Sequence, residues 1–279
     1  MRDSKLYRNH FVFQRFIITL KEFKKMATYK KKGQKKIKSA PVDKLEEEST
    51  TAEVFKNLEE NASRSEQWLE KNQKPLFTGF LVIVVSILGY LAYNNYIAEP
   101  NEREAANELA FPRDSFEKAV SASVAIDSMY TLALEGTNGK YGFVDIADKF
   151  SGTNAGNLAN YYAGISYLKI KQYDKAIAHL ERFSSNDAML APTALGAIGD
   201  AFADLEQADE ALAYYEKAAK AKTNNATTPL YLFKAANTAL DLGEKDKAVT
   251  YFSEIKEKYN SSSVAKNIEM HINKAKYSN

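Results

Sequence analysis

Few side chains in this chain combine the types and spacing that catalysis or metal binding requires. The 279 residues include no cysteine, and the three histidines, His10, His179 and His271, are isolated from one another in the sequence. The absence of cysteine excludes disulfides, a thiol nucleophile and a zinc–thiolate site. No phosphate-binding loop, dinucleotide fingerprint, nucleophile elbow or HExxH motif occurs. The sequence therefore predicts a non-enzymatic protein with no cofactor and no metal site, in which His179 is a packing or surface residue.

Three short segments remain as chemical candidates. Six lysines lie between Lys30 and Lys38, and such a run could bind anionic lipid or the ribosome. Because no aromatic platform accompanies them, we expect no specific nucleic-acid binding; a solvated tail that sets membrane topology is the alternative. The triplet at Ser128 (Asp-Ser-Met) fits an O-glycosylation acceptor pattern of some bacterial periplasmic proteins, although so short a match also arises by chance. Gly136–Gly142 is expected to form a turn.

The elements around these residues are set by one long apolar segment. No charged residue occurs between Lys74 and Glu99. The 18 residues Leu76–Tyr93 would span about 27 Å as a helix, close to the roughly 30 Å of a hydrocarbon core. We therefore predict a transmembrane helix over residues 75–96, with Pro75 in its first turn. A buried core helix is the alternative.

Small residues at helical spacings within this segment suggest a contact inside the membrane. Gly79, Ser86 and Gly89 would let a neighbouring helix approach closely. Ordinary membrane-helix composition explains them equally well.

Charge predicts the orientation of the segment. Residues 1–74 carry a net charge of +7 and residues 97–279 a net charge of −5, consistent with +2 for the whole chain. The positive-inside rule places the basic side in the cytoplasm. We expect a disordered tail over 1–48, whose true start is Met1 or Met26, then a cytoplasmic amphipathic helix over 49–74. Residues 97–279 form an extracytoplasmic domain.

The extracytoplasmic segment contains a repeat. Three stretches beginning at Leu158, Pro192 and Pro229 align, each with an apolar helix, a polar turn and an alanine at one fixed place. The alanines are Ala176, Ala211 and Ala248, separated by 35 and 37 residues. Gly164, Gly199 and Ala236 share one position of the first helices, and Tyr167, Phe202 and Ala239 share another. Residues 141–150 resemble a divergent second helix, and 262–276 a polar closing helix.

This spacing resembles the tetratricopeptide repeat, whose period is about 34 residues. The resemblance implies an all-α fold in which helical hairpins stack into a solenoid after one transmembrane helix. The order of elements, including EQWLEKNQKP before the span and YNNYIAEPNEREAANELAF after it, is similar to the YfgM-like family. Members of that family are ancillary subunits of the SecYEG translocon. The long lysine-rich tail departs from the family pattern, which puts any cytoplasmic role in doubt.

In tetratricopeptide proteins the first helices form a concave, peptide-binding face. Carried over to this chain, that face contains Tyr161, Ile165, Lys169, Asp200, Asp204, Phe233, Asn237 and Asp241 as candidate binding residues. The corresponding Leu158, Leu230 and Leu240 are expected in the core. The carboxylates of Asp200, Asp204 and Asp241 would repel an anionic segment, so we expect the groove to prefer apolar or basic segments.

These features together predict a single-pass bacterial inner-membrane scaffold. Its expected partners are Sec translocon subunits, periplasmic chaperones or client chains such as emerging polypeptide. An assembly scaffold for another envelope complex, and a regulator acting through residues 40–74, are the alternatives.

Overall fold

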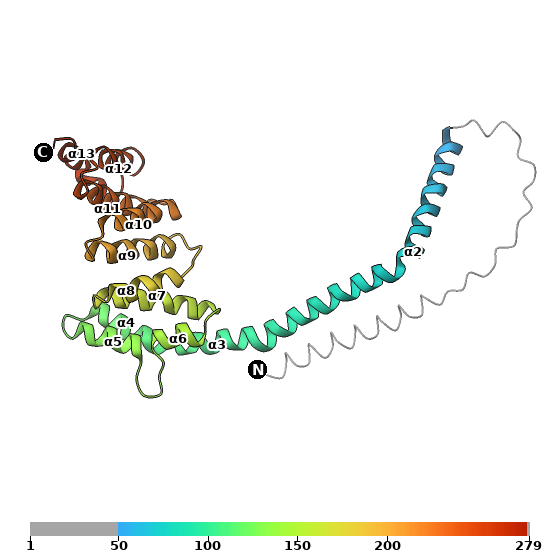
Figure 1. Ribbon diagram of the computed structural model, residues 1–279, viewed down its shortest axis with the longest axis horizontal. Helices are drawn as coiled ribbons and strands as arrows, with labels where there is room; N and C mark the ends of the chain where they lie inside the picture. Colours follow the sequence, from blue (N-terminus) through green and yellow to red (C-terminus); the bar gives the residue numbers. More distant parts are fainter. Residues whose placement is uncertain (1–49, 278–279) are drawn as a thin grey trace, which may run out of the picture. The chain divides into compact units, whose positions relative to one another are not determined.

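The computed structural model describes residues 50–277, with side chains from residue 67 onward. The tail at 1–48, its lysine run and His10 lie outside the described residues. Over the part that is described, every regular element is a helix and no strand occurs (Figure 1). The chain divides into two units, Met1–Gly79 and Phe80–Asn279, each of which is described by itself. The all-α fold expected from the sequence is confirmed.

The first described helix, α2 (Thr50–Tyr93), includes Pro75 in its interior. The expectation that Pro75 begins a new helix is therefore wrong. A proline within a helix removes one backbone hydrogen bond, and the helix-forming residues on both sides carry the backbone through it. Among the described residues, α2 and its continuation form the one helix long and apolar enough to cross a membrane, judged by length and composition. No part of its most apolar window is buried, which argues against a core helix.

The helical path continues beyond Tyr93 instead of ending at a linker. A π-helical turn, η1 (Asn94–Ala98), leads into α3 (Glu99–Glu108), and Leu109 connects α3 to α4 (Ala110–Ser121) in helical geometry. A π-turn absorbs an extra residue without ending a helix. Pro100 lies in the first turn of α3, and its missing N–H removes one backbone hydrogen bond to the preceding turn. The apolar segment and the following domain thus share continuous helical backbone.

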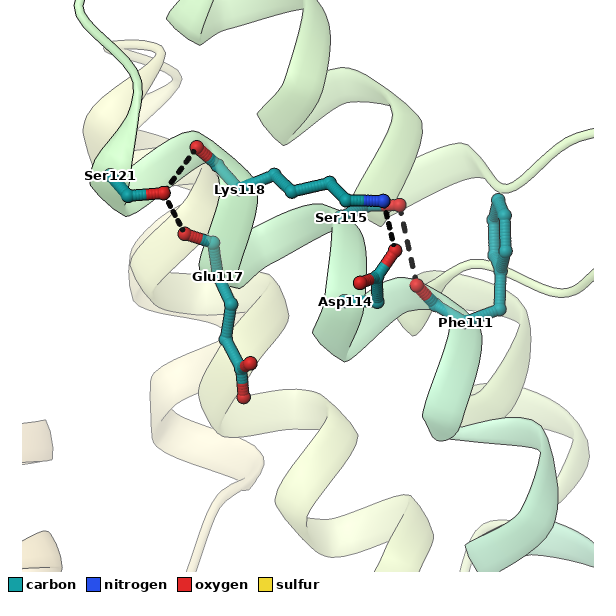
Figure 2. A network of polar contacts seen from close by, with 6 residues as sticks. All are labelled: Phe111, Asp114, Ser115, Glu117, Lys118 and Ser121. Atoms are coloured by element: carbon teal, nitrogen blue, oxygen red, sulfur yellow. Dashed lines mark hydrogen bonds and ion pairs between the residues drawn. The ribbon is translucent and has the colours of Figure 1, made fainter.

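Helix α4 ends through contacts between its own side chains and carbonyls (Figure 2). The Ser121 hydroxyl donates to the carbonyl oxygens of Glu117 at 2.9 Å and Lys118 at 3.2 Å. Such bonds satisfy carbonyls that lack a partner in the last helical turn. The Lys118 ammonium pairs with Asp114 at 2.5 Å on the exposed surface. Ala122 is then extended, with φ −76° and ψ 148°, and the chain turns toward α5.

Helices α5 (Ile126–Glu135) and α6 (Phe143–Lys149) follow. Residues 101–135 therefore form three helices, α3, α4 and α5. The glycine-rich segment between α5 and α6 is a tight turn, as predicted. Gly136 has φ +72°, and a Cβ there would lie 2.2 Å from the Lys140 carbonyl oxygen. Only glycine is free of both constraints. Ser128 is exposed in the first turn of α5.

Three helical hairpins make up the centre of the domain, stacked in succession (Figure 1). They are α7 (Asn154–Lys169) with α8 (Tyr173–Arg182), α9 (Leu190–Asp204) with α10 (Ala208–Ala221), and α11 (Thr227–Asp241) with α12 (Lys245–Lys258).

The small residues of the repeat pattern lie where the hairpin helices touch. Ala176, Ala211 and Ala248 are each 0% exposed. A Cβ at Gly164 would lie 2.4 Å from Leu180 Cγ, so the glycine lets the two helices of the first hairpin approach closely. The predicted role of these positions is confirmed by their burial.

Helices also close both ends of the array. At one end, Phe116 of α4 stacks edge-on against Tyr162 of α7, with ring centroids 5.1 Å apart. At the other, the predicted closing helix begins as a 3₁₀ turn, η2 (Ser263–Asn267), and continues as α13 (Ile268–Tyr277). Ile268 and Ile272 of α13 are buried in the same cluster as Phe252. Solenoids need such terminal elements because an end repeat has no neighbour to cover it.

Candidate binding groove

The first helices of the three hairpins, α7, α9 and α11, contact one another in succession. The second helices, α8, α10 and α12, each pack behind their own first helix. We call α7, α9 and α11 the inner helices. The eight predicted groove residues all lie on them, but they do not share one site: some line a cavity and others pack in the core.

A cavity of about 330 Å³ lies between the first and second hairpins. Three predicted residues line it: Lys169 at the end of α7, and Asp200 and Asp204 of α9. The other lining residues are Leu168, Lys171, Tyr173, Ala203 and Tyr215. We call this site the junction cavity.

Cations and a carboxylate face each other across the junction cavity. Lys171 lies in the α7–α8 turn with φ +60°, a backbone geometry that sequence reasoning did not anticipate. The ammonium groups of Lys169 and Lys171 have no hydrogen-bond or ion-pair partner in the part of the chain that the structure describes. Burial, with a hydrogen bond to Asp204, raises the pKa of Tyr173. The cavity therefore offers two cations without partners among the described residues, the carboxylates of Asp200 and Asp204, and the apolar surface of Leu168.

Asp200 is already occupied by partners within the protein. Its carboxylate accepts hydrogen bonds from the Tyr215 hydroxyl at 2.7 Å and from the Lys234 ammonium at 2.6 and 2.8 Å. Burial and this hydrogen bond raise the pKa of the Tyr215 hydroxyl. The argument that Asp200 would repel an anionic segment is therefore wrong, because Lys234 of α11 balances its charge. Lys234 was missed because the aspartate and the lysine belong to different repeats, 34 residues apart.

Tyr231 of α11 packs against the backbone of α9 at Gly196. A Cβ on Gly196 would lie 1.9 Å from Tyr231 Cε1, so the ring lies directly against the α9 backbone. Tyr231 is 5% exposed, and burial is the main cause that raises its pKa to about 12. The Tyr231 ring of α11 thus fills the space that a side chain at position 196 of α9 would otherwise occupy.

The remaining predicted residues of the first hairpin contribute mainly to packing. Tyr161 and Ile165 pack against the buried cluster that contains Leu180 and Ile198. The Tyr161 ring lies 5.1 Å from that of Phe183.

In the third hairpin the predicted residues are separated from the junction cavity. Phe233 packs edge-on against Phe252 and His271 at centroid distances of 5.6 and 4.9 Å. The Asn237 amide donates to the Phe233 carbonyl at 2.9 Å, while Asp241 is exposed.

The three leucines assigned to the core divide into two groups. Leu158 and Leu240 are partly buried against the two main clusters. Leu230 is 39% exposed, so its assignment to the core is wrong. It lies in the first turn of α11.

The small residues of the apolar helix are open. Nothing lies within 4 Å of a Cβ built at Gly79 or at Gly89. The Ser86 hydroxyl donates to its own helix, to Val82 O at 2.8 Å, and so has no unmet donor for a partner. A contact of this surface with another membrane helix stays a prediction.

The histidines in the described region have packing environments. His179 Nδ1 lies 2.9 Å from Asn160 Oδ1, and the ring stacks on Tyr167 at 5.5 Å. Burial, followed by the charge of Arg182, lowers the pKa of His179. Within residues 50–277 no cluster of His, Asp or Glu could hold a metal ion.

Comparison with known families identifies these hairpins. Residues 192–225 match one tetratricopeptide-repeat model, and residues 158–187 and 231–262 match another. Together the matches cover about a third of the chain. No curated protein matches the chain. Tetratricopeptide repeats are typically non-enzymatic scaffolds that bind other proteins. The helical hairpins over residues 158–262 are therefore tetratricopeptide repeats, and the C-terminal region is a protein-interaction scaffold.

Proposed function

We propose that this protein is a single-pass inner-membrane scaffold whose repeat domain binds partner proteins or emerging polypeptide beside the Sec translocon. The apolar helix and the charge difference across it support a cytoplasmic N-terminus and a periplasmic C-terminal domain. The order of elements, similar to the YfgM-like family, supports the association with Sec. The observation that carries the proposal is the junction cavity on the inner face of the repeats.

The chemistry of the junction cavity defines the segment that it would bind. Lys169 and Lys171 lack partners within the described residues, whereas Asp204 contacts Tyr173 and Asp200 is balanced by Lys234. Leu168 and Ala203 supply apolar surface. An extended segment that places an acidic side chain beside an apolar one fits this arrangement. The pairing of Asp200 thus changes the expected preference from apolar or basic segments to segments that combine an acidic and an apolar side chain.

Site-specific photocrosslinking of the full-length protein in its native membrane tests the groove. A photoreactive residue replaces Ala203, which is exposed on α9 at the junction cavity, or Ala213, which is exposed on α10 away from it. We expect Ala203 variants to crosslink to a defined partner or client chain and Ala213 variants to do so at background level. Equal crosslinking from both positions would exclude the groove as the binding site.

The Sec association requires its own test. Purification of the full-length protein from native membranes in a gentle detergent, followed by mass spectrometry, should yield translocon subunits in near-stoichiometric amounts. Recovery of a different envelope complex would remove the Sec assignment and leave the protein-binding scaffold unchanged.

A further inference from the structure

A second cavity, of about 560 Å³, lies where the apolar helix leaves the span. One wall is formed by the helical stretch from Tyr93 to Arg103, and the other by the loop Ser151–Asn154 before α7. We call this site the exit cavity. It is separate from the junction cavity and shares no residue with it.

Hydrogen bonds tie the two walls of the exit cavity together. The Glu102 carboxylate accepts from the backbone N–H groups of Asn154 at 2.6 Å and Ala155 at 3.0 Å. Helix α7 thereby receives an anion at its N-terminus, where the helix dipole favours negative charge. Glu104, the residue after Arg103, pairs with Lys149 of α6 at 3.2 Å. These contacts hold the loop beside the continuation of the span.

The position of the cavity along the helix corresponds to the lipid headgroups. If Leu76–Tyr93 fills the hydrocarbon core, the headgroup layer extends about 5–8 Å beyond Tyr93, or roughly four to five helical residues. Asn94 and Ile97 lie within this layer. Arg103 starts about 15 Å beyond Tyr93, but helical side chains lean toward the N-terminus. If the Arg103 side chain extends back along the helix, its guanidinium reaches the outer edge of this layer.

The cavity combines groups that recognise a phosphate diester. Arg103 is exposed and has no hydrogen-bond or ion-pair partner in the described region. Its planar guanidinium offers paired donors that match phosphate oxygens. The Ser151 hydroxyl and the Asn94 amide line the same cavity and add neutral donors.

We propose that the exit cavity binds the phosphate of a phospholipid headgroup, with Arg103 on the phosphate. This inference rests on the membrane-spanning part of the proposed function and does not depend on partner binding in the groove. Bound lipid would set the depth at which the repeat domain stands above the bilayer.

Retention of lipid by the full-length protein tests the proposal. The protein is reconstituted into nanodiscs that contain phosphatidylethanolamine, phosphatidylglycerol and a phosphate-free glycolipid, then released for native mass spectrometry. We expect the wild-type protein to retain both phospholipids in preference to the glycolipid. Arg103→Gln should retain roughly tenfold less, the scale of one charge-assisted hydrogen bond. The matched control is Arg113→Gln, because Arg113 is an exposed arginine on α4 that pairs with Glu117 at 3.7 Å outside the cavity.

Hydrogen exchange in detergent separates a lipid from a free anion. Added phosphatidylethanolamine should slow exchange at residues 151–153, whereas millimolar inorganic phosphate should not. Equal protection by phosphate alone, equal retention of the glycolipid, or unchanged retention by Arg103→Gln would each overturn the lipid site. Failure of the wild-type protein to enter the nanodisc would instead refute the membrane span, and this proposal with it.

Discussion

The two junctions that flank α9 join the same kind of repeat by different means. Between the first and second hairpins, the contact is mainly apolar. Ile198 of α9 is buried in one cluster with Leu180 of α8, and Tyr161 and Phe183 of the first hairpin pack against it. This contact leaves the junction cavity open. Between the second and third, Tyr231 lies against Gly196, and Lys234 pairs with Asp200. One junction is closed by a ring and an ion pair, and the other retains space for a ligand.

One residue position accounts for much of this difference. The inner helices carry Tyr161, Gly196 and Phe233 at the same place in the repeat. Only Gly196 lacks a side chain, so only there does the next helix insert a ring against the backbone. Because solenoid stability is the sum of repeat and interface terms, the two junctions can differ in strength while the repeats keep one fold.

The largest expected effect is at Gly196. Gly196→Ala would place a Cβ 1.9 Å from the Tyr231 ring and should lower the free energy of unfolding by about 3 kcal/mol, the upper end for overpacking. Because alanine has a higher helix propensity than glycine, the substitution would raise stability if there were no clash. A loss of stability therefore identifies the steric conflict with Tyr231. Thermal unfolding of the full-length protein in detergent, followed by circular dichroism, measures it.

The companion variant for this test removes the ring. Tyr231→Leu in the Gly196→Ala background should recover part of the lost stability. If Gly196→Ala is neutral, Tyr231 does not close the second junction.

The next effect is expected on the apolar side. Phe183→Ala should lower the free energy of unfolding by about 2 kcal/mol, less than the 3–5 of a fully buried phenylalanine, because Phe183 is only partly buried. Hydrogen exchange should increase in α7 and α8 more than in α11 and α12. Met189→Ala, at a residue 50% exposed, serves as the control and should change little. Uniform loss of protection across all repeats would contradict independent junctions.

The ion pair at the closed junction should contribute less to the free energy of unfolding than the apolar contacts do. Lys234 and Asp200 have side chains 33% and 37% exposed, so solvent screens their attraction, and Asp200→Asn should cost about 1 kcal/mol. The amide oxygen of asparagine can still accept from Tyr215. A double-mutant cycle with Lys234→Met measures the coupling. A coupling energy of zero would mean that the ring alone closes this junction.

Acid is expected to weaken the first repeat. The pKa of His179 is lowered in the folded protein, chiefly by burial, so the unfolded chain binds a proton first as the pH falls below its ordinary value of about 6.5. Stability at the first repeat is thus complete above that pH and decreases as the pH falls toward the folded pKa. The slope stays below about 1.4 kcal/mol per pH unit.

Unfolding of wild type and His179→Gln between neutral pH and pH 5 measures this dependence. Glutamine can still donate to Asn160 but does not titrate. If both proteins lose the same stability over this range, His179 is not the responsible group.

Much of the fold was predictable from local patterns. Ala176, Ala211 and Ala248 predicted where the paired helices touch. Two closely packed helices leave space for no side chain larger than a methyl group at one position of each repeat. The uncharged stretch before Glu99 predicted the long apolar helix, because a charge in hydrocarbon is expensive and a span-length segment therefore lacks one. The boundary at Pro75 was not predictable, since a proline permits both a helix start and a helix interior when its neighbours favour helix.

The candidate site was predictable only in part. The positions carried over from the repeat family predicted that Lys169, Asp200 and Asp204 share one face, and the structure places them around one cavity. The prediction succeeded because helices that repeat at a fixed interval present equivalent residues to the same face. The family positions did not show that Asp200 pairs with Lys234. That contact depends on the rotation of one hairpin relative to the next, which no periodicity within a single repeat encodes.

The sequence by itself determined that this chain has one span-length apolar helix and three stacked repeats, because hydrophobic length and small-residue spacing are local properties. The tertiary structure decided which junction is open and which is closed. It also decided that Glu102, 52 residues before Asn154, joins the continuation of the apolar helix to the first repeat. These outcomes depend on the distances between side chains from separate helices, which are set only when the helices pack.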